Sequence, residues 1–227
     1  MLLSNLLHII YPRTCVACAR YIKEGILCPQ CARNLPRTEQ AHVRDNITEQ
    51  TLALAGVKHI EKAAAFLFYE KDHPIQMMIH RMKYMERPDI GYHLGRLAAI
   101  EFMYADFFDE IEVIVPMPLH PKRLRERGYN QSEYIARGIS DVTGIPVDTD
   151  HVTRVRNTPK QALQEGKERA ANMKEAFDVS HPEQLYHKHI LLVDDLITTG
   201  ETMKACLKAM RQFRGAKFTV FALCKAR

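Results

Sequence analysis

One stretch of the sequence decides the fold: His189-Ile190-Leu191-Leu192-Val193-Asp194-Asp195-Leu196-Ile197-Thr198-Thr199-Gly200-Glu201-Thr202. Its apolar first part is typical of a buried strand, and this strand ends in adjacent carboxylates. A short loop of threonines and glycine follows, and apolar residues then recur at helical spacing from Met203 to Met210. Ligands of an open α/β sheet bind at the carboxyl ends of its strands, so we expect the binding site at this loop.

The loop suits a ligand that has a phosphate at one end and a sugar at the other. Backbone N–H groups at the start of a helix, together with the helix dipole, favour an anion. We expect this phosphate site at Thr198, Thr199, Gly200, Glu201 and Thr202. Asp194 and Asp195 would repel a phosphate, so they suit sugar hydroxyls or a magnesium ion held through water. A Walker-type nucleotide loop is excluded, because the sequence contains no G-x-x-x-x-G-K-[ST].

The segments around this stretch alternate between strand and helix patterns. Apolar runs predict further strands at residues 63–69, 111–115 and 218–224. Pro116 and Pro118 end the strand at 111–115, because proline cannot donate to a strand ladder. Helical spacing of apolar residues predicts helices at residues 75–82, 94–98 and 135–142. Strands that alternate with helices predict an α/β fold, in which a mostly parallel sheet is flanked by helices.

Cysteines crowd near the N-terminus in a pair of C-x-x-C motifs, made of Cys15, Cys18, Cys28 and Cys31. Such motifs supply the thiolates of a tetrahedral metal site, and zinc prefers this ligand set. A closed shell leaves no position for chemistry, so the sequence predicts a small N-terminal zinc-binding knuckle of structural role. Iron is the alternative metal, because it also accepts tetrahedral thiolates. Cys206 and Cys224 lie in apolar segments and are expected to be buried thiols.

The composition is typical of one sizeable domain with a small appendage. The chain has 227 residues, 46% of them apolar and 26% charged, and its net charge of +5 mildly favours phosphates or polyanions as partners. Residues 1–10 are apolar but shorter than a membrane span, and they lack the basic leader of a signal peptide. We therefore expect a cytoplasmic protein without a transmembrane segment, with an amphipathic helix at residues 1–10. Membrane association of that helix is the lesser alternative.

Several segments resemble known families. Residues 192–202 resemble the phosphoribosyl pyrophosphate (PRPP) motif of type I phosphoribosyltransferases. Residues 115–131, which read VPMPLHPKRLRERGYNQ, resemble a second hallmark, that of the ComF competence family. The same family is indicated by the N-terminal cysteines and by a segment with Arg156, Thr158, Gln161, Leu163, Arg169 and Asn172. The resemblance covers nearly the whole chain and implies a type I phosphoribosyltransferase-like sheet behind the zinc knuckle.

The resemblance also implies which residues hold the ligand. Asp194 and Asp195 would contact the ribose 2′- and 3′-hydroxyls, and residues 198–202 the 5′-phosphate. The PRPP contacts would further include Pro116, Met117 and Pro118. Magnesium would accompany PRPP.

Cationic side chains crowd into residues 120–137 and 151–174. In phosphoribosyltransferases the loop that corresponds to the first segment handles pyrophosphate, which implies catalytic roles for Lys122 and Arg123 beside Asp194 and Asp195. Single-stranded nucleic acid is the competing interpretation, with the candidates Arg123, Arg125, Arg127 and Tyr129. A solvated face is the third, and it is as well supported as function for residues 151–174. His120 and the pair Lys83-Tyr84 are further candidates to face the site.

We divide the chain into a helix with the zinc knuckle at residues 1–40, a connector at 41–61 and a phosphoribosyltransferase-like domain at 62–227. The family resemblance implies a PRPP-binding protein that serves DNA uptake in natural transformation by handling single-stranded DNA. A DNA-uptake helicase or other competence proteins would then be its partners. The alternative is a true phosphoribosyltransferase that acts on an unidentified small-molecule acceptor in nucleotide metabolism. The sequence contains no glutaminase domain, which argues against an amidophosphoribosyltransferase.

Overall fold

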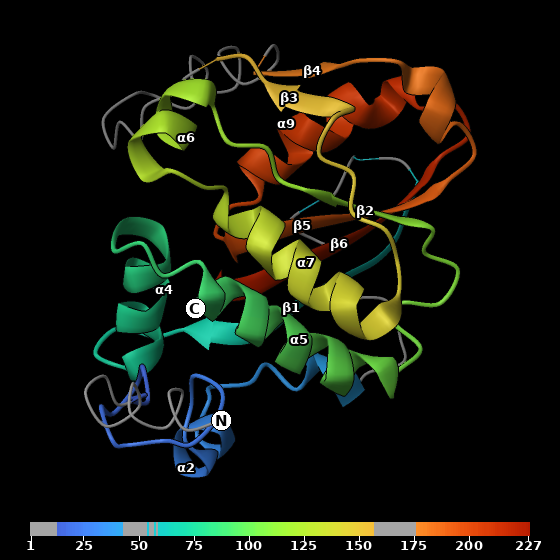
Figure 1. Ribbon diagram of the computed structural model, residues 1–227. Coiled ribbons are helices and arrows are strands. Elements are labelled where there is room, and N and C mark those ends of the chain that lie inside the picture. The colour runs from blue at the N-terminus through green and yellow to red at the C-terminus, as the bar shows by residue number, and fades with distance from the viewer. Residues whose placement is uncertain (1–12, 43–53, 55–56, 58, 157–175) are drawn as a thin grey trace, which may run out of the picture.

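The computed structural model describes residues 13–42, 54, 57, 59–156 and 176–227 (Figure 1). The helix expected at residues 1–10, most of the connector 41–61 and residues 157–174 of the second basic segment lie outside these ranges. The same holds for the family-motif residues Thr158, Gln161, Leu163, Arg169 and Asn172.

A four-stranded, fully parallel sheet forms the centre of the fold. Its strands, in spatial order, are β1 (Ile60–Tyr69), β6 (Lys217–Ala226), β5 (His189–Ile197) and β2 (Val113–Pro116). The central strands β5 and β6 are almost wholly buried, because helices cover both faces, and their sequences are therefore apolar runs without alternation. Every strand of this sheet overlaps a predicted one, so the expected α/β fold with a parallel sheet is confirmed.

Each face of the sheet holds its own apolar core. On one face lie α4 (Pro74–Tyr84), α5 (Asp89–Met103) and α7 (Gln131–Thr143), and β5 contributes Leu191 and Val193. On the other face lie α9 (Glu201–Ala209) and the 3-10 turn η3 (Met210–Gln212), and β5 contributes Ile190 and Leu192. Because side chains alternate along a strand, Asp194 continues the α9 face and Asp195 the α4 face.

Helices α5 and α7 approach each other closely, because each has a glycine at the contact (Figure 1). A Cβ atom on Gly95 would collide with the backbone carbonyl of Ile135, and one on Gly138 with that of Tyr92. This packing fixes α7, whose first turn reaches the carboxyl end of β5 through Ser132.

The structure differs from the loop implied for residues 120–131, because a helix, α6 (Pro121–Arg127), lies within it. The His120 side chain caps the helix by accepting a hydrogen bond from the Lys122 backbone N–H at 3.2 Å. Pro121 fills the first turn, and Gly128 ends the helix with a φ of 82°. These cap signals, Pro121 and Gly128, are present in the sequence and are typical of a helix.

A short antiparallel pair, β3 (Val152–Arg154) with β4 (Phe177–Val179), was also not expected. It packs on the α9 side of the sheet through Val152 and Phe177. Each strand has only three residues, which is too short for a periodic pattern to be read from sequence. A 3-10 turn, η2 (Pro182–Leu185), leads from this pair towards β5.

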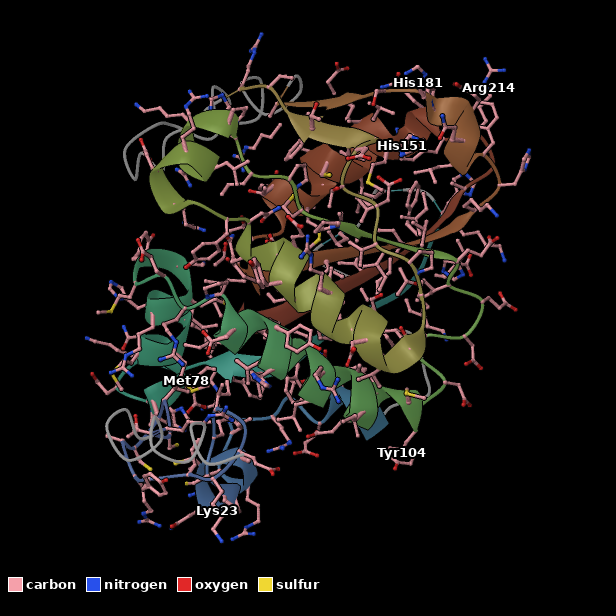
Figure 2. All side chains as sticks on the ribbon, in the orientation of Figure 1. Lys23, Met78, Tyr104, His151, His181 and Arg214 are labelled. Atoms are coloured by element: carbon pink, nitrogen blue, oxygen red, sulfur yellow. The ribbon has the colours of Figure 1, made fainter. Side chains whose placement is uncertain are left out.

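The cysteine unit, residues 13–39, packs against the domain that contains the parallel sheet. It contains the short helix α2 (Pro29–Arg33), and the 3-10 turn η1 (Gln40–His42) follows. Val16, Ile26 and Leu35 belong to the same apolar core as α4 and α5. Arg37 forms an ion pair with Glu101 of α5, at 2.8 Å. The unit lies beneath α4 and α5, and Lys23 marks its far end (Figures 1 and 2).

Candidate functional site

The acid pair lies where β5, β2 and the start of α7 meet. Asp194 Oδ1 accepts hydrogen bonds from the Ser132 hydroxyl at 3.0 Å and from the Asp195 backbone N–H at 2.8 Å. The Asn130 side chain accepts from the Ser132 N–H and donates to the backbone carbonyl of Met117, at the end of β2. Ser132 was missed in the sequence, although Asn130 before a helical pattern is a cap signal that would have placed it in the first turn.

Asp195 faces α4 and forms a buried ion pair there. Its Oδ1 lies 2.8 Å from Lys83 Nζ, and the side chains are only 7% and 12% exposed. Its Oδ2 is buried and has no hydrogen-bond partner among the described residues. Lys83, a candidate from the sequence, therefore lies at the acid pair. Tyr84, which follows it, lines the cavity next to the pair.

The two acids differ in their electrostatic surroundings. Burial and the neighbouring Asp195 carboxylate raise the pKa of Asp194 to about 7, against the opposing effects of the Asp195 N–H, Lys83 and Ser132. Burial would lower the pKa of Lys83, but its attraction to Asp195 and Asp194 outweighs burial and raises the pKa. Lys83 is thus a permanent cation at neutral pH.

The predicted phosphate loop joins β5 to α9. Gly200 precedes the helix with a φ of 75° and makes no side-chain cap, so no capping side chain satisfies the first-turn N–H groups of α9. Thr198 and Thr199 are exposed beside it. Glu201 forms an ion pair with Lys204 at 2.9 Å. Uncapped N–H groups at a helix start are groups that an anion can satisfy.

The end of β2 contributes backbone and apolar side chains. The Met117 N–H donates to the Val193 carbonyl at 2.7 Å, so strand pairing continues one residue beyond Pro116. The Met117 side chain is buried in the core on the α9 side, and Pro118 is half-buried. The carboxyl end of the parallel strands thus holds Pro116, Met117 and Pro118 beside the acid pair.

A cavity of about 360 Å³ opens between the end of α4 and α6. It is lined by Lys83, Tyr84, Glu86, Arg123, Glu126, Arg127 and Tyr129. The Arg127 guanidinium lies 5.4 Å from the centre of the Tyr84 ring, and the Tyr129 hydroxyl donates to the Met82 carbonyl at 2.6 Å. Arg123 and Arg127 therefore line the same cavity as Lys83, whereas Lys122 and Arg125 are exposed on α6.

Arg154 on β3 is a further cation at the site. Burial and repulsion by Arg123 lower its pKa, and attraction to Asp194 opposes that shift. Its guanidinium lies 5.4 Å from the centre of the Phe177 ring. The sequence placed Arg154 only within a broad basic segment, because nothing local signals that β3 returns to the acid pair.

The N-terminal cysteines form one cluster. Their sulfur atoms all lie within 4.8 Å of one another, which fits a tetrahedral thiolate site. Cys28 caps α2 by accepting a hydrogen bond from the Cys31 N–H at 3.4 Å. Burial raises the pKa of Cys15, but the N–H groups of Cys28, Ala17 and Cys18 outweigh it and lower this pKa to about 6. A thiolate is therefore favoured there at neutral pH, which is the form that binds a metal.

Cys206 and Cys224 are fully buried thiols, as expected, and burial raises both pKa values. Within the described residues, no helix is long and apolar enough to cross a membrane.

Comparisons with known proteins agree with the geometry. Residues 130–227 match the phosphoribosyl transferase domain, and this range includes Ser132, the acid pair and the loop at 198–202. The chain is 28% identical to the DNA utilization protein YhgH of Escherichia coli K12, over 93% of this chain and 89% of that protein. It is 28% identical to Competence protein F of Haemophilus influenzae, over 97% and 93%.

Other matches are more distant. The chain is 22% identical to Competence protein ComFC of Bacillus subtilis, over 94% of this chain and 85% of that protein. A solved glutamine PRPP amidotransferase from B. subtilis is 19% identical and covers 63% of this chain and 30% of its own, with a TM-score of 0.42. The domain match and the competence proteins confirm the resemblance to the ComF family.

Proposed function

We propose that this chain, a homologue of Competence protein F with a phosphoribosyl transferase domain at residues 130–227, binds PRPP with magnesium. One observation carries the proposal: the acid pair Asp194–Asp195 lies near the carboxyl end of β5, which runs two residues further to Ile197, and the uncapped start of α9 follows after the short loop 198–200. A ribose 5-phosphate unit has the matching chemistry, hydroxyl donors at one end and an anion at the other.

The anionic leaving group of PRPP needs cations, and the cavity beside the acid pair supplies them. Arg123 and Arg127 line it, and Arg154 approaches from β3. Magnesium would be held largely by the oxygens of PRPP and by water, because both Oδ1 atoms of the acid pair already have protein partners. When bound, it would neutralise charge on the diphosphate.

The biological role we propose is DNA uptake, through the handling of single-stranded DNA in the cytoplasm. Support comes from the names of the relatives, a competence protein and DNA utilization proteins that align with almost the whole chain. The exposed cations Lys122 and Arg125 on α6 continue from Arg123 and Arg127, which suits a phosphate backbone. A DNA-uptake helicase or other competence proteins would be the partners.

A second candidate is a phosphoribosyltransferase enzyme that acts on a small-molecule acceptor. The cavity of about 360 Å³ favours it, because its size suits a small molecule and its lining includes Lys83, which contacts Asp195. Asp194, Asp195, Lys122 and Arg123 would then be the catalytic candidates.

Calorimetry with PRPP, with and without magnesium, tests the ligand. Saturable binding to the full-length protein that Asp195→Asn weakens supports the proposal, and absence of binding overturns it. Release of pyrophosphate in the presence of candidate acceptors would favour the enzyme. For the cysteine unit we propose one structural zinc ion bound by Cys15, Cys18, Cys28 and Cys31.

A further inference from the structure

The two oxygens of Asp195 are in unequal positions. Oδ1 is 2.8 Å from Lys83 Nζ, whereas Oδ2 is buried without a hydrogen-bond partner among the described residues. A buried acceptor without a donor is costly, so such atoms are rare in folded proteins unless a ligand or water satisfies them. The missing donor should therefore come from whatever binds beside the acid pair.

We propose that Lys83 is a positioning residue: by holding Oδ1 of Asp195 it aims Oδ2 at a hydroxyl group of the bound sugar, and it thereby makes the site select ribose over deoxyribose. This inference rests on the proposed binding of a phosphorylated ribose. Lys83 lies on α4, outside the matched domain range of 130–227, so the domain match assigns it no role.

Lys83 is the group that can fix the Asp195 carboxylate. Its stem is buried with the ion pair, so the ammonium group has little freedom to swing away. The other groups around the acid pair act on Asp194 instead: Ser132 donates to it, and Arg154 is attracted to it while Arg123 repels Arg154. Without Lys83 the Asp195 carboxylate could rotate, and neither oxygen would be held for the ligand.

A fixed acceptor discriminates by the donors that a ligand lacks. A sugar that has no hydroxyl at the contacted position leaves Oδ2 unpaired, and sites built around a hydroxyl reject such analogues strongly. DNA offers no donor at either position, since its sugars lack the 2′-hydroxyl and its internal 3′-oxygens are esterified. The interior of a DNA strand therefore cannot take the place of ribose at Asp195, so an internal segment would bind elsewhere, as on α6.

The test compares ribose 5-phosphate with its 2-deoxy and 3-deoxy analogues by calorimetry, in magnesium-free buffer and with the full-length protein. We expect the wild type to prefer ribose 5-phosphate over at least one analogue by about ten- to hundredfold. Lys83→Met should reduce that preference to within about threefold, because it weakens the binding of ribose 5-phosphate and leaves the binding of the analogue unchanged. Lys83→Arg, which keeps the charge, should retain part of the preference. Lys217→Met, at the amino end of the central strand β6 and so at the end of the sheet away from the acid pair, is the control and should change nothing.

Two outcomes would overturn the inference while the proposed function stands: a wild type that binds all three sugar phosphates equally, or a Lys83→Met variant that weakens all three equally. Failure of the wild type to bind both ribose 5-phosphate and PRPP would instead overturn the proposed function. Lys83→Met leaves Asp195 buried without its counter-ion and can fail to fold, so Lys83→Met with Asp195→Asn is made as well. We expect this double variant to bind ribose 5-phosphate as Asp195→Asn alone does. A further loss of affinity in the double variant would contradict the proposed coupling.

Discussion

The Arg81 guanidinium donates a hydrogen bond to the backbone carbonyl of Val16, 3.2 Å away, and so joins α4 to the cysteine unit. Lys83 follows two positions later on the same helix and holds Asp195. The cysteine cluster and the candidate ribose site thus share one helix as their support. Disturbing the cluster should therefore affect ligand binding, although none of the cysteines lines the cavity beside the acid pair.

The first prediction concerns the metal. The purified protein should contain one zinc ion, and Cys28→Ser should lose it, because Cys28 is one of the proposed ligands and also caps α2. We expect a loss of about 3 kcal/mol or more in the free energy of unfolding, since a metal that closes a small unit contributes folding energy. Elemental analysis and thermal denaturation are the measurements. PRPP affinity should fall as well, through α4.

Cys206→Ser is the matched control, because Cys206 is a buried cysteine outside the cluster. It should keep the full metal content. Protein purified without chelator that contains neither zinc nor iron would contradict the metal site, and iron alone would correct the choice of metal.

The second prediction concerns the phosphate loop. Thr199→Ala should weaken PRPP binding about tenfold or more, because hydrogen bonds to charged groups contribute about 1.5–3 kcal/mol. Thr199 is exposed, so the folded state should be unaffected. Thr149→Ala, another exposed threonine on a distant loop, should bind PRPP like the wild type. Equal affinities of all three proteins in calorimetry would show that this loop does not hold the phosphate.

Much of the fold was predictable because its signals are local. The apolar run before Asp194 predicts a buried strand wherever it lies in the sheet, and the C-x-x-C pairs bring the cysteines together by spacing alone. The α6 helix has local signals too, Pro121 at its start and Gly128 at its end, but a helix of seven residues is too short for apolar periodicity to support them.

The remaining features of the site depend on contacts between distant segments. Lys83 was a candidate, yet its pairing with Asp195 joins residues from separate elements, and no pattern in either segment specifies it. Tyr129 was a candidate for stacking on a base, whereas its hydroxyl donates a hydrogen bond to the Met82 carbonyl. This contact depends on where α4 lies in the fold, so the sequence around Tyr129 does not specify it. The attraction between Arg154 and Asp194 also joins distant segments, so no local pattern predicts it.

The third prediction tests the helix contact that places Ser132. Gly138→Ala should destabilise the protein by about 2 kcal/mol or more, because the added methyl group collides with the Tyr92 backbone, which cannot move without separating α5 from α7. The measurement is urea denaturation. Arg137→Ala, on the exposed side of the same helix, should cost well under that amount. A fully stable Gly138→Ala would show that the helices are less closely packed.

The fourth prediction concerns pH. The pKa of Asp194 is about 7 in the folded protein, against an ordinary value of 3.8. Between these values the folded state binds more protons than the unfolded state, so this group makes stability fall as pH rises from about 4 to about 7. Asp194→Asn removes the titration. The stability of the wild type relative to Asp194→Asn should therefore decrease over this range and level off above it. A difference that does not change with pH would contradict the assignment.

The last prediction concerns single-stranded DNA. If α6 contacts the phosphate backbone, affinity for a labelled strand should fall steeply with salt, by about 0.7 decade per decade for each contact. Arg123→Glu with Arg125→Glu should then lower the slope by about 1.4, which is two contacts at about 0.7 each. Fluorescence anisotropy across a salt series measures both quantities.

A second pair of charge reversals, away from α6, distinguishes DNA binding by the α6 surface from an effect of net charge alone. Arg211→Glu with Arg214→Glu changes the total charge by the same amount, but Arg214 lies at the corner of the molecule far from α6 (Figure 2). That variant should keep the wild-type slope, and an equal drop in both variants would mean that only net charge matters.

Adding PRPP to the same assay shows whether the two ligands share a surface. Because Arg123 lines the cavity beside the acid pair, competition is expected if its guanidinium serves both. Binding of both ligands at once would place the strand on the exposed side of α6, around Lys122 and Arg125.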